Sequence, residues 1–138
     1  MTSPPVKTTL EWTRGRAFRG SGSGGELVLD GDRRAGCSPT ETLTLALAGC
    51  MAIDVVLILE KRRARLDSLR VAVDGTRADT EPRRFTRLAL RFELAGSGFT
   101  EAHVERAIAL SREKYCSVWH SLRQDIELET TFIVRTSQ

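Results

Sequence analysis

The sequence predicts one α+β domain over residues 1–138, with the element order βββ–α–ββ–α–β and sheets that cover a long central helix. Three features predict this fold. Strand-like alternation occupies both ends of the chain, a long apolar stretch near the middle is helical in character, and a second helical stretch precedes the last strand. A chain of 138 residues is long enough for one hydrophobic core and too short for two comfortable ones.

The first part of the chain is expected to form three short strands. VKTTLEW (6–12), AFRG (17–20) and ELVLDGD (26–32) are the three segments, and the last ends in an Asp-Gly turn. SGSGG at 21–25 supplies a flexible connection between the second and the third strand.

The central helix is expected to run from Ser38 to about Arg63. Ser38 can cap free N–H groups, and Pro39 suits the first helical position. The segment is apolar almost all round, which is typical of a helix buried by several neighbours. Thr44 and Asp54 interrupt the apolar run, so an uninterrupted span of about 18 to 20 apolar residues is lacking and no membrane crossing is expected.

Two strands, a second helix and a closing strand are expected to follow. Residues 69–73 alternate and lead to Asp-Gly at 74–75, and residues 88–94 alternate as a half-buried antiparallel strand. Thr100 opens the second helix, and residues 126–134 form the closing strand. The apolar positions of the second helix recur at helical spacing: Val104, Ile108, Tyr115, Trp119 and Leu122.

Charge and composition exclude several classes of function. The net charge of +3 comes mostly from scattered arginines, which is not the pattern of a nucleic-acid-binding arm. The short basic cluster at 61–65 is expected to be a solvated helix end that complements the helix dipole. The first twelve residues hold prolines and threonines where a signal peptide would be apolar. A cytoplasmic location follows as the default, and thiols stay reduced there.

The candidate reactive groups are two cysteines, one in each helical stretch. Taken alone, Cys50 would more often be a packing residue than a nucleophile. Gly49 beside it destabilises a helix interior, which suggests that a small residue is needed there, either for close helix packing or to leave room for a small substrate. Asp54 lies one turn later on the same face, and its carboxylate would disfavour a thiolate. An active Cys50 thiolate therefore needs a cation from elsewhere in the protein.

The segment TRGRAFRG offers three candidate cations, Arg14, Arg16 and Arg19, whose alternative role is plain surface charge. Glu41 could orient such an arginine. Nine residues of one helix advance by about 900° and about 13 Å, so Glu41 and Cys50 face opposite ways. If both belong to one site, Glu41 comes from a second subunit. Its alternative role is that of a first-turn acid that favours the helix dipole.

Cys116 has a possible partner of its own in His120, four residues later. Such a pair can build a cysteine nucleophile or half of a zinc site. No further cysteine and histidine cluster has metal-ligand spacing, so no metal site is expected. Cys37 is expected to be exposed in a loop and incidental. Tyr115 and Trp119 are expected in the core, with the wall of an apolar pocket as the alternative.

Two motifs in the right order resemble those of the OsmC/Ohr family, the osmotically inducible and organic-hydroperoxide-resistance proteins. SPTETLTLALAGCMAIDVVLILEKRR, with Cys50, resembles the long helix of that family, and LSREKYCSVWHSL, with Cys116, resembles its second cysteine motif. The likeness extends over nearly the whole chain and is closest to the YhfA-like branch. It implies an OsmC-like fold, an intertwined homodimer and active sites at the subunit interface.

The resemblance also implies an activity, a thiol-dependent peroxidase that reduces organic hydroperoxides. Cys50 would be the peroxidatic nucleophile and Cys116 the resolving thiol, with re-reduction by an external dithiol, lipoyl-type in some members, and no metal or organic cofactor. The family's arginine corresponds best to Arg19. Its glutamate directly follows the proline, whereas Thr40 intervenes here before Glu41.

Two rival functions remain open at this point. A redox-sensing or small-ligand-binding dimer could use the same pocket without fast turnover, and Asp54 beside the thiol favours it. Nucleic-acid binding through the 61–65 cluster has little support, since it would require steeply salt-dependent DNA binding.

Overall fold

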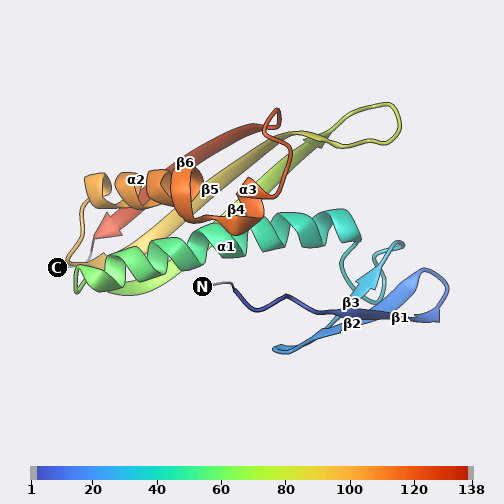
Figure 1. Cartoon of the computed structure of the whole chain (residues 1–138). Coiled ribbons are helices and arrows are strands. Elements are labelled where there is room, and N and C mark those ends of the chain that lie inside the picture. Colours follow the sequence, from blue (N-terminus) through green and yellow to red (C-terminus); the bar gives the residue numbers. More distant parts are fainter. Residues whose placement is uncertain (1–2, 137–138) are drawn as a thin grey trace. The chain divides into compact units, whose positions relative to one another are not determined.

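A computed structural model describes residues 3–136 of the chain. By contacts between Cα atoms the chain divides into two compact units, Met1–Leu43 and Thr44–Gln138. The order of the larger elements along the chain is the predicted one, three strands, a helix, two strands, helical segments and a final strand (Figure 1). That residues 1–138 act as one domain stays a prediction.

The first unit contains a three-stranded antiparallel sheet. Its strands are β1 (Thr9–Arg14), β2 (Ala17–Gly22) and β3 (Gly25–Asp30), in the order β1-β2-β3. The predicted glycine-rich connection is a tight turn in which Gly22 pairs with Gly25, whose φ of 145° favours glycine. The three predicted strands are therefore confirmed, although β1 begins at Thr9 and not at Val6.

The helix α1 (Pro39–Lys61) begins where the sequence predicts. The Ser38 hydroxyl accepts a hydrogen bond from the Glu41 N–H at 3.2 Å, and the Glu41 carboxylate accepts one from the Ser38 N–H at 2.9 Å. This reciprocal pair is a capping box, which satisfies N–H groups that a helix start otherwise leaves free. The hydrogen bonds from Ser38 lower the pKa of Glu41 below its ordinary value.

The long helix is buried along one stripe only. Leu47, Met51, Val55 and Leu59, four residues apart, pack against the sheet of the second unit and are almost completely buried. Apolar side chains elsewhere on α1 stay exposed in the single chain, so the expectation of a helix buried all round is wrong for one copy. By length and composition α1 (mean hydropathy 2.3) would pass for a membrane-crossing helix, as core helices of globular proteins also do.

The second unit is built on a three-stranded sheet with the order β4-β5-β6. β4 (Arg65–Arg77) and β5 (Phe85–Ser97) are antiparallel, as expected, whereas β6 (Glu127–Thr136) runs parallel to β5. The Asp-Gly at 74–75, to which the alternating residues 69–73 lead, lies inside β4. A Cβ atom at Gly75 would come within 2.6 Å of the Phe85 ring, which explains the glycine there by close approach.

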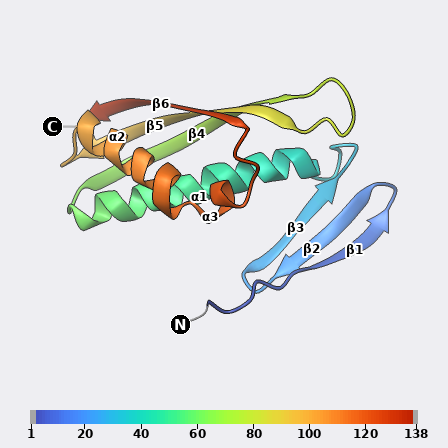
Figure 2. The ribbon, with the colours of Figure 1, turned by 45° about the horizontal axis from the view of Figure 1, so that its top comes forward.

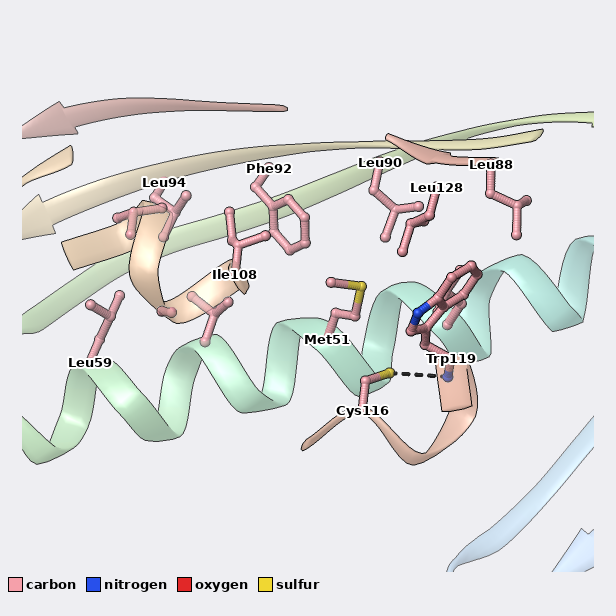
Figure 3. Close-up of a cluster of buried hydrophobic side chains, with 14 of the residues drawn as sticks. Met51, Leu59, Leu88, Leu90, Phe92, Leu94, Ile108, Cys116, Trp119 and Leu128 are labelled. Carbon is pink, nitrogen blue, oxygen red and sulfur yellow. Dashed lines mark hydrogen bonds between the residues drawn. The ribbon is translucent and has the colours of Figure 1, made fainter. Parts of the chain in front are cut away.

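The second helical stretch is not one helix, and this corrects the prediction. It consists of α2 (Glu101–Leu110), the short π-helix η1 (Ser111–Tyr115) and α3 (Ser117–His120). Thr100 caps α2, as expected for its first position. The break falls at Cys116, whose backbone is extended. α1 and α2 run antiparallel over one face of the sheet (Figures 1 and 2), and Met51, Phe92 and Trp119 lie in the layer between helices and sheet (Figure 3).

Candidate functional site

The two cysteines predicted to act together do meet in the second unit. Cys116, after η1, belongs to the buried core cluster, and Cys50 on α1 packs against that cluster, near enough to raise the pKa of Cys116. Both are free thiols. Cys116 is completely buried, whereas Cys50 is only partly buried. A partly exposed thiol thus neighbours an enclosed one, an arrangement that suits disulfide formation.

The surroundings of Cys116 keep its proton on the sulfur. Burial raises the pKa of Cys116 to about 11, and the neighbouring Cys50 thiol adds to this rise. The hydrogen bond from the Trp119 N–H opposes it, because it lowers the pKa. That N–H donates to the Cys116 sulfur at 3.3 Å (Figure 3), and both residues are buried in the core. At neutral pH Cys116 therefore carries its proton.

Ser111 connects the two cysteine-bearing segments. Its hydroxyl donates to the Asp54 carboxylate at 2.7 Å, one helical turn beyond Cys50. Its carbonyl accepts from the Cys116 N–H at 2.8 Å, the longer-range hydrogen bond that closes the π-helix. One fully buried serine thus ties α1 near Cys50 to the backbone of Cys116.

The sequence analysis did not identify Ser111 as part of the site, although its position in the chain indicates that it is buried. It continues the buried face of α2 that carries Val104, Ala107 and Ile108. A hydroxyl on such a face requires a hydrogen-bond partner. Asp54, expected to act on Cys50, is that partner, so its carboxylate has a structural role that the sequence did not indicate.

His120 does not pair with Cys116 as a catalytic histidine would. Its ring Nε2 lies 2.9 Å from the Arg112 carbonyl oxygen, and its side chain is exposed. The expected burial of Trp119 is confirmed, but that of Tyr115 is wrong because half of its surface is exposed. Cys37 is exposed, as expected.

Arg19 and Glu41 belong to the first unit. Arg19 projects from β2, is exposed and lies 3.9 Å from the carboxylate of Glu26. Arg16 instead pairs with Asp32 at 3.0 Å. Glu41 forms the capping box described above. The catalytic roles expected for Arg19 and Glu41 stay predictions.

Within residues 3–136, no group of three or more histidine, cysteine or acidic side chains is placed to hold a metal ion. The candidate site is therefore defined by its dithiol and by the Ser111–Asp54 contact that ties the segments carrying it.

Comparisons with known proteins agree with one another. A family model described as OsmC-like protein matches residues 30–131. Protein YhfA of Escherichia coli (strain K12) is 36% identical over 131 residues, covering 94% of this chain and 98% of that protein.

Two solved structures extend the comparison. A hypothetical protein from Aquifex aeolicus VF5 superposes with a TM-score of 0.90 at 24% identity, covering 99% of this chain and 100% of that one. The organic hydroperoxide resistance protein OhrB of Bacillus subtilis superposes with a TM-score of 0.61 at 13% identity, covering 94% and 98%. At these identities the two structures establish the fold and no more.

Proposed function

Because the chain belongs to the OsmC-like family, we propose that it is a thiol peroxidase that reduces organic hydroperoxides, with Cys50 as the attacking thiol and Cys116 as the resolving thiol. The observation that supports this proposal is the proximity of the two thiols, which come from distant parts of the chain. The named activity of the B. subtilis neighbour agrees with it.

The first step consumes the peroxide. The Cys50 thiolate attacks the terminal oxygen of R–O–OH, and the O–O bond breaks. The alkoxide takes up a proton and leaves as the alcohol R–OH, and Cys50 becomes a sulfenic acid. The peroxide gains two electrons and the sulfur loses two. Partial exposure of Cys50 suits this step, because the substrate reaches it from solvent.

The second step closes the disulfide. The Cys116 sulfur attacks the sulfenic sulfur of Cys50, and the S–OH oxygen leaves with the Cys116 proton as water. The raised pKa of Cys116 fits this order, since the resolving thiol stays protonated while Cys50 reacts first. An external dithiol, lipoyl-type by analogy with the family, then reduces the disulfide and becomes a disulfide itself.

A second copy of the chain is the partner that we propose for α1. Leu45 and Ile53 each expose 60% of their surface, and Gly49 lies between them at four-residue spacing. A Cβ atom at Gly49 would meet nothing within 4 Å, so packing inside one chain does not explain this glycine. An apolar stripe of this kind is a typical helix–helix interface, and a homodimer would cover it.

Arg19 and Glu41 complete the proposed site. Arg19 would supply the cation that stabilises the Cys50 thiolate. Glu41 lies nine residues before Cys50 on α1 and faces the opposite way, so it would act on the thiol of the second subunit. The proposed reaction uses no metal or organic cofactor. We expect the protein, and the dithiol that reduces it, to be cytoplasmic.

Turnover of an organic hydroperoxide with a dithiol reductant tests the proposal. Cys50→Ser should abolish peroxide consumption, and Cys116→Ser should leave a sulfenic acid that is over-oxidised. Cys37→Ser is the matched control and should consume peroxide like the wild type. Unchanged turnover in Cys50→Ser would contradict the proposal, and a single oxidation of Cys50 without turnover would favour the redox-sensing alternative.

A further inference from the structure

The loop between β3 and α1 is built around one buried carboxylate. Asp30, the last residue of β3, exposes 5% of its surface. Its carboxylate accepts hydrogen bonds from three backbone N–H groups of the loop, those of Asp32 at 2.8 Å, Ala35 at 2.9 Å and Arg34 at 3.2 Å. These bonds, that from Ala35 first, lower the pKa of Asp30, so the carboxylate is ionised at neutral pH. One charged side chain therefore fixes the backbone of the loop.

The end of the loop is also attached to β3. The Asp30 N–H donates to the Cys37 carbonyl at 2.9 Å, and Leu29 forms an isolated parallel bridge with Cys37. A Cβ atom at Gly36 would come within 2.3 Å of the Val28 carbonyl oxygen, so the loop packs directly on the strand. The position of Cys37, the residue before the helix cap, is thus set by β3.

The fixed end of the loop leads directly to Glu41. Ser38 is the next residue, and its N–H and hydroxyl both donate to Glu41 Oε1, at 2.9 Å and 3.1 Å. The Ser38 carbonyl accepts hydrogen bonds from the N–H and the hydroxyl of Thr42, each at 2.9 Å. A continuous path of backbone and hydrogen bonds therefore leads from the Asp30 carboxylate to the Glu41 carboxylate, and it lies within the first unit.

The loop also holds a strained arginine near Glu41. Arg33 has a φ of 58°, a left-handed conformation that residues other than glycine rarely adopt. Its N–H donates to the Asp30 carbonyl at 3.0 Å. The hydrogen bonds from Ser38 and, less strongly, the charge of Arg33 lower the pKa of Glu41, so the two side chains are near each other. Backbone strain persists only where the surrounding structure enforces it, and it is typical of functional sites.

We propose that Asp30 is a positioning residue for Glu41 in the peroxidase reaction. Its carboxylate holds the loop in the arrangement that keeps Glu41, with Arg33 near it, in place to act on the thiol of the second subunit. The inference rests on the proposed function, which gives Glu41 that role. Asp30 is enclosed by its own chain, so the argument does not depend on which surfaces the second copy covers.

Turnover of an organic hydroperoxide by the full-length protein, measured as kcat/KM with a dithiol reductant, tests the proposal. Asp30→Asn, which removes the charge and one acceptor oxygen, should lower kcat/KM roughly tenfold, as should Glu41→Gln. The double variant should lose no more than Glu41→Gln alone, because Asp30 acts through Glu41. Asp32→Asn is the matched control. It removes an exposed acid of the same loop, the partner of Arg16, and should leave kcat/KM unchanged.

A purely structural role of Asp30 would give a different result. Asp30→Asn would then lower kcat/KM by the same factor with and without Glu41, and such additive effects would overturn the proposal. An unchanged kcat/KM in Asp30→Asn would overturn it too. Urea unfolding of each variant measures the folded fraction under the assay conditions, to which the rates are normalised.

Amide hydrogen exchange of the wild type tests the connection without any substitution. The N–H groups of Arg34 and Ala35 bind Asp30, and that of Ser38 binds Glu41. If one carboxylate holds the whole loop, these groups open together and their protection should agree within about threefold. Much faster exchange at Ser38 than at Ala35 would show that the loop does not hold Glu41, and it would overturn the proposal.

The outcomes separate this inference from the proposed function. Turnover that is lost in Cys50→Ser and unchanged in Asp30→Asn would refute the positioning role alone. Turnover that falls in Asp30→Asn and is unchanged in Glu41→Gln would remove Glu41 from the site and leave Asp30 a purely structural residue. Turnover unchanged in Cys50→Ser would refute the peroxidase proposal, and with it the role of Asp30 that rests on it.

Discussion

Removing the Ser111 hydroxyl should weaken both the fold and the alignment of the thiols. Ser111 is fully buried, and its hydroxyl donates to the Asp54 carboxylate at 2.7 Å. A hydrogen bond to such a group contributes about 1.5–3 kcal/mol, and its loss leaves a partly buried acceptor without that donor. Ser111→Ala should therefore lower the free energy of unfolding by about 2 kcal/mol, roughly a thirtyfold change in the unfolding constant.

Urea unfolding measures this change, with Ser121→Ala as the matched control. The Ser121 hydroxyl also donates at 2.7 Å, to the Ser117 carbonyl, but it is exposed, so its removal should cost less than about 0.5 kcal/mol. A double-mutant cycle of Ser111→Ala with Asp54→Ala should give a coupling of at least about 1 kcal/mol. Additive single effects, or a Ser111→Ala change as small as the control, would refute this reasoning.

The same substitution should have a redox consequence. The Ser111–Asp54 bond ties η1, and hence Cys116, to the turn of α1 that follows Cys50. In Ser111→Ala the sulfenic acid of Cys50 should live longer and react more with a sulfenic-acid trap. If the trap labels Ser111→Ala no more than Ser121→Ala, this prediction is wrong. Ser111 would then stabilise the fold without helping Cys116 to form the disulfide with Cys50.

Three other results are expected. Because the pKa of Cys116 is raised from 9.0 to about 11, its contribution to the free energy of unfolding is complete below pH 9.0 and is lost as the pH rises to about 11. Urea unfolding across this range should show the loss in the wild type and not in Cys116→Ser. Ile53→Lys should convert the proposed dimer to a 15.3 kDa monomer by light scattering, and an unchanged mass would argue against the α1 interface. Arg19→Gln should slow alkylation of Cys50 at neutral pH while Arg14→Gln does not; equal rates in both would remove Arg19 from the site.

The parts of the fold that depend on local chemistry were predictable from the sequence. The start of α1 follows from Ser38, Pro39 and Glu41, because a cap and its reciprocal acid act over three residues. Strand β5 follows from simple alternation, since one face of it is buried.

The break at Cys116 was not predictable in the same way. Apolar residues keep helical spacing from Val104 to Leu122 across the break, so periodicity alone indicates one helix. The break depends on the π-turn from Ser111 and on the Cys116 sulfur, which accepts the Trp119 N–H and caps α3. The parallel direction of β6 likewise depends on the path of the chain through α2 and α3 and not on the strand's own residues.

Arguments from single residues could not predict that Cys50 and Cys116 lie close together. Burial statistics favoured packing for Cys50, and spacing offered His120 as the partner of Cys116. Only the paired motifs of the family resemblance connected Cys50 with Cys116, and in the structure Cys50 lies near enough to raise the pKa of Cys116. The Ser111–Asp54 contact joins residues far apart in the sequence, so neither residue alone indicates it.

The most direct test of the account is to map the disulfide formed after one equivalent of an organic hydroperoxide. The protein is oxidised, its remaining thiols are blocked, and the peptides are identified by mass spectrometry without reduction. The account predicts a linkage between Cys50 and Cys116, with Cys37 still a free thiol. A Cys50 that is left unmodified, or a disulfide that uses Cys37 in place of Cys116, would contradict it.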